Sequence, residues 1–294
     1  MHLTTEKRVL IVGLGLIGGS YAKALTKKGY HVSAITRSPG TITYALKNNI
    51  IAEGSADIDP QIIGQADIVV FALYPQVFID WLKDNQQFLK SGAILTDVTG
   101  VKCSVVYRVQ SLLRTDVEFI AAHPMAGREV YGIENSDDTI FRKANYIVTP
   151  TEKNTENAIA LCEELGHELG FARVSRLSPE AHDDMIGFLS QLTHCIAISL
   201  MNCNDTPGME AYTGDSFRDL TRIARINDRM WSELFMCNRE QLLRHMDAFS
   251  ESFAAFRQML EEGDVDAMRE AMAAPPPAEN FSTKNNGTKE NAYD

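Results

Sequence analysis

Cysteine is scarce and scattered in this chain of 294 residues. Its five cysteines include no Cys-x-x-Cys pair and no spacing typical of His/Cys metal ligation. An odd number of separated thiols provides no disulfide framework, so we expect reduced cysteines and a cytoplasmic location. The same absence predicts that the protein has no metal site.

The sequence also lacks long apolar runs and an excess of positive charge. We find no apolar run approaching the length of a membrane span, and the N-terminus lacks the apolar segment of a signal peptide. The formal net charge of −11 argues against binding to nucleic acid or to an anionic membrane. The composition, 45% hydrophobic and 23% charged, is that of a globular protein long enough for two domains.

Strand-like runs alternate with helical segments over the first 175 or so positions. The predicted strands occupy 8–12, 31–36, 67–73, 93–97, 117–121, 145–149 and 171–176. Such alternation predicts an α/β fold, with a mostly parallel sheet covered by helices on both faces. We therefore expect a Rossmann-like nucleotide-binding domain over residues 1–177.

The pattern changes at Ser178, after which no convincing strand follows. Apolar residues recur at helical spacing up to Ile196, and a second long helix is predicted from about Asp228. Because that helix is rich in large apolar side chains, we predict an all-α substrate and dimerisation domain over 178–273 that forms a homodimer. The polar residues 274–294 predict a disordered tail.

A glycine-rich turn follows the first predicted strand, in Gly13-Leu14-Gly15-Leu16-Ile17-Gly18. Strand, G-x-G-x-x-G and helix form the arrangement that places a dinucleotide pyrophosphate on a helix N-terminus. Gly13 permits the tight turn, Gly15 lets the backbone approach the phosphates, and Gly18 lets the helix pack on the strand. The predicted cofactor-binding residues of this turn are Gly13, Gly15, Leu16, Ile17 and Gly18.

The end of the second predicted strand lacks the acidic residue that usually binds the ribose 2′-hydroxyl of NAD. The chain has Thr36, Arg37 and Ser38 there. A guanidinium and two hydroxyls can bind a 2′-phosphate, which a carboxylate would repel. We therefore predict NADP as the cofactor, with NAD as the alternative, although Arg37 could equally be a solvated loop residue.

Two further polar segments follow predicted strands, where ligands of open α/β sheets bind. Thr99, Gly100 and Lys102 could border the nicotinamide, or they could cap a helix and leave a surface lysine. His123 follows the next strand and is stiffened by Pro124. A neutral imidazole there can accept a proton near pH 7, as oxidation of an alcohol requires, although a lone histidine is more often structural.

The helical half offers a polar stripe and several arginines. Asp183, Gly187, Ser190 and His194 fall on one face of the helix that begins near Ser178, and they face either water or a cleft. The arginines that follow could bind a carboxylate in a bidentate manner. The sequence does not decide which of them points inward.

In combination, these segments resemble the prephenate/arogenate dehydrogenases of tyrosine biosynthesis. The matching blocks, in family order, are GLGLIGGS (13–20), TDVTGVK (96–102), HPMAGRE (123–129), HDDMIGFLSQLTH (182–194) and FRDLTRIARINDRMW (217–231). The resemblance implies oxidative decarboxylation of a cyclohexadiene, with hydride transfer to the nicotinamide, loss of CO2 and formation of a phenol. It implies prephenate as the small-molecule substrate, with arogenate as the alternative.

The resemblance also assigns roles to individual positions. His123 matches the residue that accepts the proton of the ring hydroxyl, and Arg222 matches the arginine that binds a substrate carboxylate. Many members have serine where this chain has Gly100, and Thr99 is the candidate to replace its hydroxyl. The other positions that the resemblance places at the site are Ser190 and His194, which face substrate and nicotinamide, and Trp231, Asp183 and the rim residues Arg128 and Glu129.

Asp215 is a candidate for recognising the ammonium group of arogenate, although it could equally cap the next helix. Two other functions compete with this interpretation. A β-hydroxyacid dehydrogenase generally uses a lysine in its helical domain, and lysine is missing between Ala181 and Asp228. A protein that senses NADP without turnover would not need a histidine, an arginine and a polar stripe together.

Overall fold

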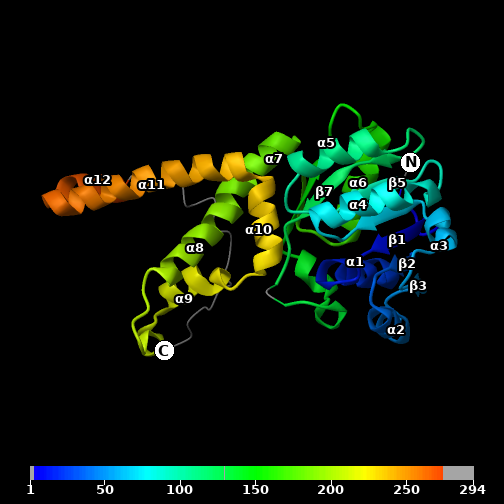
Figure 1. Ribbon diagram of the computed structural model, residues 1–294, viewed down its shortest axis with the longest axis horizontal. Coiled ribbons are helices and arrows are strands. Elements are labelled where there is room, and N and C mark those ends of the chain that lie inside the picture. Colours follow the sequence, from blue (N-terminus) through cyan, green and yellow to red (C-terminus); the bar gives the residue numbers. More distant parts are fainter. Residues whose placement is uncertain (1–2, 129, 274–294) are drawn as a thin grey trace, which may run out of the picture. The chain divides into compact units, whose positions relative to one another are not determined.

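The computed structural model describes residues 3–128 and 130–273 (Figure 1). Contacts within the chain divide it into two units, the first ending at Leu242 and the second beginning at Leu243. The predicted tail, residues 274–294, lies outside the described residues, as does Glu129.

The first unit holds the strands and most of the helices. Its strands are β1 (Arg8–Val12), β2 (His31–Ile35), β3 (Glu53–Ser55), β4 (Ile68–Phe71), β5 (Ile94–Asp97), β6 (Glu118–Phe119), β7 (Ala121–Pro124), β8 (Asn145–Thr149) and β9 (Arg173–Arg176). The helices that pack with them are α1 (Leu16–Lys27), α2 (Pro39–Lys47), α3 (Pro60–Gln65), α4 (Pro75–Asn85), α5 (Cys103–Leu112) and α6 (Glu156–Glu168). Short 3-10 turns are η1 (Gln86–Phe88), η2 (Ile133–Asn135) and η3 (Asp138–Phe141).

Six of the strands form a parallel sheet in the order β3-β2-β1-β4-β5-β6. This is the strand order of a Rossmann-like fold, in which the order reverses between β1 and β4. The predicted fold class is therefore confirmed. Ligands of such sheets bind at the carboxyl ends of the strands beside that reversal, which directs attention to the segments after β1, β4 and β5.

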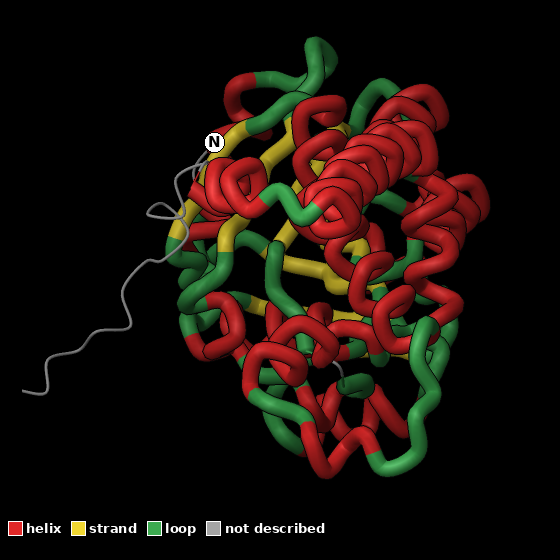
Figure 2. Tube along the Cα trace, turned by 90° about the vertical axis from the view of Figure 1, so that its left-hand side faces the viewer, coloured by secondary structure: helices red, strands yellow, loops and turns green. Residues whose placement is uncertain are grey.

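Helices cover both faces of this sheet (Figure 2). Alternate residues of each strand point to opposite faces, so Val9 and Ile11 of β1 belong to one core and Leu10 and Val12 to the other. The first core is shared with α1, α2 and α6, and the second with α3, α4 and α5. Both faces of the strands are buried, which explains their nearly continuous apolar sequences.

Two parts of the sheet region differ from the sequence prediction. The predicted strand 117–121 is two strands: β6 ends the large sheet, and β7 begins a three-stranded sheet in the order β7-β8-β9. β7 pairs antiparallel with β8, and β8 pairs parallel with β9. The short β3 was not predicted, because its sequence Glu-Gly-Ser carries no apolar signal.

The helical part of the first unit begins at α7 (Pro179–Ile186), where the Ser178 hydroxyl accepts a hydrogen bond from the Ala181 N–H. Ser178 is therefore the N-cap of α7. The helix continues through a π-helical segment, η4 (Gly187–Leu192), into α8 (Thr193–Asn202). This whole run is long and apolar enough to cross a membrane by length and composition alone, with mean hydropathy 1.3. The expectation that no apolar run approaches the length of a membrane span is therefore wrong for residues 179–202.

The second long helix is also interrupted. After η5 (Met209–Tyr212), α9 (Asp215–Thr221) and η6 (Arg222–Ala224), α10 spans Asp228–Cys237 and α11 begins at Arg239. The break falls at Asn238, whose side-chain N–H donates to the Asp183 carbonyl and to Gln191 Oε1, each at 2.8 Å. A buried polar side chain that bonds to two other segments thus ends a helix that the apolar spacing predicts to continue.

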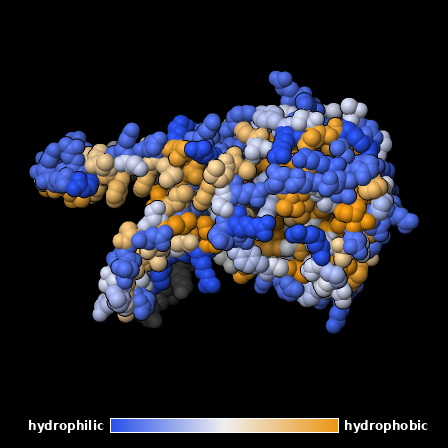
Figure 3. Space-filling view, viewed as in Figure 1, coloured by the Kyte–Doolittle hydropathy of each residue, from blue (hydrophilic) through white to orange (hydrophobic). Residues whose placement is uncertain are grey.

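The second unit consists of the rest of α11 (Arg239–Glu262) and α12 (Val265–Ala273). Phe249, Phe253 and Leu260 are exposed on α11 at spacings of four and seven residues, which places them on one face of the helix. Exposed apolar side chains also occur on the helices of the first unit, among them Phe188 and Met236. Figure 3 shows that hydrophobic atoms form part of the molecular surface. Both units therefore leave apolar helical surface uncovered.

Candidate active site

The glycine-rich turn has the geometry that a dinucleotide phosphate requires. Gly13 has a φ of 94°, and a Cβ there would lie 2.4 Å from the carbonyl oxygen of Ala72, just beyond β4. A Cβ at Gly18 would lie 2.0 Å from the Gly13 carbonyl oxygen. In contrast, a Cβ at Gly15 would meet nothing within 4 Å. Gly13 and Gly18 are thus needed for packing, whereas Gly15 leaves open the N-terminus of α1, where backbone N–H groups can bind an anion.

The residues predicted to bind the ribose follow β2. Thr36 is half-buried, and Arg37 and Ser38 are exposed. The Ser38 hydroxyl accepts a hydrogen bond from the Thr41 N–H at 3.2 Å and so caps α2. The Arg37 side chain reaches solvent at the carboxyl edge of the sheet, on the same edge as the glycine-rich turn.

A buried ion pair lies at the end of β5. Lys102 and Asp97 are both 0% exposed, with Nζ 2.8 Å from Oδ2. Lys102 Nζ also donates to the Ala122 carbonyl oxygen at 2.5 Å, and Asp97 Oδ1 accepts from the Ala122 N–H at 3.1 Å. The sequence left two alternatives for Lys102: a residue beside the nicotinamide or a surface lysine. The structure supports neither, because the ammonium is fully buried and paired with Asp97. Its ammonium ties β7 to β5 directly before His123.

Thr99 belongs to the same cluster. Its hydroxyl lies within hydrogen-bond distance of the Asp97 carboxylate and the Val101 carbonyl oxygen, either of which can take its one proton, and it accepts from Lys102 Nζ. These bonds occupy the hydroxyl within the β5 segment. The geometry therefore gives no support to the expectation that Thr99 replaces the serine hydroxyl missing at Gly100.

Asp183, on α7, bonds to the N-terminus of α5. Its Oδ1 accepts from the Lys102 N–H and its Oδ2 from the Cys103 N–H, both at 2.8 Å. The residue is 2% exposed. Its predicted role as a substrate-binding residue on a polar stripe is not supported, because its carboxylate is already occupied by protein groups. The negative charge instead offsets the positive end of the α5 dipole.

His123 lies in β7, and its ring contacts a second histidine that the sequence prediction missed. His123 Nδ1 is 2.8 Å from His182 Nε2, and His182 Nδ1 is 2.8 Å from Asp183 Oδ1. The two rings meet edge to face with their centroids 5.0 Å apart. His182 is fully buried, whereas His123 is half-buried. The signal that could have found His182 is the His-Asp pair in the first two turns of α7.

The surroundings favour neutral imidazoles and a charged carboxylate. Burial lowers the pKa of His123 well below its ordinary value of 6.5, and His182 and the Lys102 ammonium add to this effect. Burial also lowers the pKa of His182, although Asp183 acts in the opposite direction. Burial alone would raise the pKa of Asp183, but hydrogen bonds from His182 and from the α5 backbone hold it below its ordinary value. His123 is therefore neutral at pH 7 and able to accept a proton.

The Nε2 atom of His123 faces the backbone of Gly100. A Cβ at Gly100 would lie 3.8 Å from His123 Nε2 and 3.7 Å from Leu234 Cδ1, ordinary contact distances. Leu234 belongs to α10, so the helical part of the unit contacts the same space as the sheet edge. A small side chain fits at Gly100 without displacing either neighbour.

A carboxylate from α10 also caps a helix of the nucleotide-binding region. Glu233 Oε1 accepts a hydrogen bond of 2.8 Å from the Gln76 N–H, in the first turn of α4. Asn227, which caps α10, bonds to the Tyr74 hydroxyl at 3.3 Å. Together with the bonds from the start of α5 to Asp183 of α7, these contacts place α7 and α10 against the carboxyl edge of the sheet.

Trp231, Ser190 and His194 come together on α10, η4 and α8. The His194 ring stacks on Trp231 with centroids 3.8 Å apart and an interplanar angle of 32°. His194 Nδ1 donates to the Ser190 carbonyl oxygen at 2.8 Å, and both residues are half-buried. Trp231 precedes Leu234 by three positions, so both lie on one face of α10. Of the predicted polar stripe, Ser190 and His194 therefore lie together beside Trp231. Asp183 is separated from them, because it is buried and the π-helical segment η4 lies between.

Three predicted substrate-binding residues lie at the surface. Arg222 is exposed in η6, which packs against α8. Arg128 pairs with Asp137 at 2.8 Å, and Asp215 pairs with Arg218 while its side chain is 92% exposed. Asp215 is the first residue of α9, whose N-cap is Gly214.

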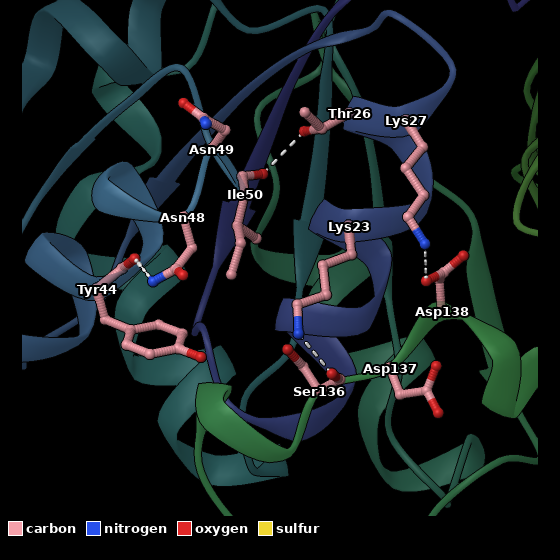
Figure 4. Close-up of a pocket in the computed structure, with 10 residues that line it drawn as sticks. All are labelled: Lys23, Thr26, Lys27, Tyr44, Asn48, Asn49, Ile50, Ser136, Asp137 and Asp138. Atoms are coloured by element: carbon pink, nitrogen blue, oxygen red, sulfur yellow. Dashed lines mark hydrogen bonds and ion pairs between the residues drawn. The ribbon is translucent and has the colours of Figure 1, made fainter.

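A cavity of about 520 Å³ lies along the C-terminal half of α1, and Asp137, the ion-pair partner of Arg128, is among the residues that line it (Figure 4). Its charged walls are largely paired: Lys27 with Asp138, and Lys23 with the Ser136 carbonyl oxygen. None of the residues predicted to bind substrate or cofactor lines it. Thr99 and His123 lie instead near the end of β5, where Asp97 and Lys102 bond to Thr99 and Ala122. In the described residues, no group of three or more His, Cys, Asp or Glu side chains could hold a metal ion.

Comparisons with known proteins agree with this organisation. Residues 21–175 match the prephenate dehydrogenase nucleotide-binding domain, and residues 178–274 match the prephenate dehydrogenase dimerization domain. Prephenate dehydrogenase of Bacillus subtilis is 27% identical over 88% of this chain and 71% of its own length. Cyclohexadienyl dehydrogenase of Zymomonas mobilis is 29% identical over 91% of this chain and 93% of its own.

A solved structure is similar over most of the chain. Prephenate dehydrogenase from A. aeolicus, in complex with hydroxyphenyl propionate and NAD+, is 29% identical and has a TM-score of 0.83. The similarity covers 91% of this chain and 95% of that one. The two family models together span most of the sequence, on both sides of the junction between β9 and α7. The chain therefore belongs to the prephenate dehydrogenase family of NAD(P)-dependent oxidoreductases.

Proposed function

We propose that this protein oxidatively decarboxylates prephenate to 4-hydroxyphenylpyruvate, using NADP. The observation that carries the proposal is the position of His123: a neutral imidazole at the carboxyl edge of the sheet, with Nε2 facing Gly100 and near Leu234 of α10. Family membership supports the reaction class. The position of the glycine-rich turn at the same edge supports binding of the cofactor beside the substrate.

The reaction requires a proton acceptor at the ring hydroxyl. A nicotinamide dinucleotide held at the glycine-rich turn, by Gly13, Gly15 and Gly18, would supply the acceptor for the hydride that leaves the ring carbon bearing this hydroxyl. His123 Nε2 takes the hydroxyl proton as the carbonyl forms, and the ring carboxylate then leaves as CO2, its bonding electrons completing the aromatic ring. His123 can return the proton to the phenolate oxygen, so the protein is unchanged at the end. Arg222 is proposed to hold a substrate carboxylate, and Trp231 with His194 to line the site.

The preference for NADP rests on the segment after β2. An exposed guanidinium at Arg37 and the hydroxyls of Thr36 and Ser38 can bind a 2′-phosphate, and no carboxylate follows β2 at these positions. Replacing Arg37 by Ala should raise KM for NADP by roughly tenfold and leave KM for NAD unchanged, since one charge-assisted hydrogen bond is lost. Lys47→Ala, at the exposed end of α2, is the control. An equal effect on both cofactors would contradict the assignment.

Arogenate is the alternative substrate. It differs from prephenate only by an amino group in place of the keto group, and the Z. mobilis relative carries the broader name cyclohexadienyl dehydrogenase. The test is a four-way assay of prephenate or arogenate against NADP or NAD, followed by absorbance of the reduced nicotinamide. The proposal predicts the highest kcat/KM for prephenate with NADP. Tight NADP binding without turnover of either substrate would favour a nucleotide sensor.

We also propose that the protein is a homodimer. The match of residues 178–274 to a dimerization domain and the exposed apolar side chains of the helices support this. Light scattering of the full chain should give twice the mass of 32.7 kDa. Phe253→Glu, on the exposed face of α11, should shift the equilibrium toward the monomer, whereas Gln258→Glu on the same helix should not.

A further inference from the structure

We propose that His182 and Asp183 are positioning residues that fix His123 in the one tautomer able to accept the substrate proton. The inference rests on the proposed function, because a fixed tautomer matters only if His123 is the base. It is carried by the order of donors and acceptors along the three side chains and by the anchoring of both ends of this chain of hydrogen bonds.

The order of protons follows from the Asp183 end. A carboxylate can only accept, so the contact of 2.8 Å between Asp183 Oδ1 and His182 Nδ1 places a proton on that nitrogen. A neutral His182 then has a lone pair on Nε2. The 2.8 Å contact between this atom and His123 Nδ1 needs one proton, which His123 must supply. Nε2 of His123 is left unprotonated, facing Gly100.

The Asp183 end of the hydrogen-bond chain is anchored on α5. Both Asp183 oxygens accept backbone N–H groups at the start of that helix, from Lys102 and Cys103. The His123 end is anchored on the same segment, because the Lys102 ammonium and the Asp97 carboxylate hold the backbone of Ala122. The imidazole is therefore fixed through its ring and through its backbone by one stretch of chain, residues 97–103.

The charges around the two rings act on a protonated His123 in opposite directions. The charged groups near the rings are Lys102 beside α5, Asp97 of β5 and Asp183 of α7, and the apolar Leu234 of α10 lies near Gly100. When Nε2 takes a proton, His123 becomes a cation that still donates from Nδ1 to His182. The Asp183 carboxylate, reached through His182, favours that cation, whereas Lys102 opposes it.

Two substitutions of His182 separate positioning from mere packing. In His182→Leu the side chain has similar bulk but no acceptor, so His123 loses the partner that selects its tautomer. In His182→Gln, Oε1 can lie near the former Nε2 and accept from His123 Nδ1. We expect kcat to fall roughly 10²-fold in His182→Leu and to stay within about tenfold of wild type in His182→Gln. KM and NADP affinity should remain unchanged in both. His167→Gln, on the exposed end of α6, is the control.

A second readout does not depend on turnover. Nitrogen-15 NMR of the imidazoles should find His123 protonated on Nδ1 in the wild type and shifted toward the Nε2-protonated form in His182→Leu. A wild-type His123 protonated on Nε2, or equal kcat in the Leu and Gln variants, would overturn the inference. Failure of the wild type to oxidise prephenate or arogenate would instead refute the proposed function.

Discussion

Replacing His123 by Asn isolates the contribution of its Nε2 atom. The Asn side-chain N–H can take the place of Nδ1–H and still donate to His182, while no atom replaces the acceptor that faces Gly100. The local hydrogen bonding is thus retained and only the base is lost. Loss of a general base lowers kcat by roughly 10²–10⁴, which corresponds to about 3–5 kcal/mol of activation free energy.

The assay for this variant follows reduced nicotinamide at saturating substrate, with NADP affinity measured separately by fluorescence titration. The expected result is a large fall in kcat with a nearly unchanged dissociation constant for NADP. Lower activity with equally weakened NADP binding would indicate damage to the fold. Turnover within a few-fold of wild type would refute the assignment of His123 as the base.

Two further predictions concern the binding of the substrate carboxylate and the stability of the folded protein at acid pH. Arg222→Ala should raise KM for substrate by roughly 10–100-fold with a smaller change in kcat, because a charge-assisted hydrogen bond to the substrate is lost. Arg225→Ala is the control. An unchanged KM in Arg222→Ala would assign the substrate carboxylate to another arginine. His123 and His182 both have a pKa below 6.5 in the folded state, so the unfolded chain binds more protons below that pH. Their contribution to stability is fully present above pH 6.5 and is lost as pH falls, by up to about 1.4 kcal/mol per pH unit for each imidazole. Urea unfolding at pH 7.5 and 5.5 should show a smaller loss in His182→Gln than in wild type; identical losses would contradict this.

Much of the nucleotide-binding region could be predicted because its signals are local. Gly13, Gly15 and Gly18 are spaced by the geometry of a single turn, and the apolar strands carry their own pattern. β3 and the division between β6 and β7 could not be predicted in this way. The sequence Glu-Gly-Ser of β3 has no apolar alternation that would indicate a strand. β6 ends at Phe119 and β7 begins at Ala121, so one short extended run continues from the first sheet into the second.

The site was predicted only in part, because its chemistry depends on contacts between distant segments. His123 could be found from its position after a strand. His182 and the roles of Asp183 and Lys102 could not, since they arise where α7 packs on α5, about 80 positions away in sequence. The break at Asn238 has the same origin: its partners lie on α7 and η4, and the apolar spacing across it gives no sign of an interruption.

The most direct test of the central claim is a crystal structure of the protein with prephenate and NADPH, a pair that cannot react. The account predicts the ring hydroxyl about 2.6–3.2 Å from His123 Nε2 and one substrate carboxylate on Arg222. A bound ring whose hydroxyl lies beyond reach of His123, with both carboxylates held by other residues, would contradict it.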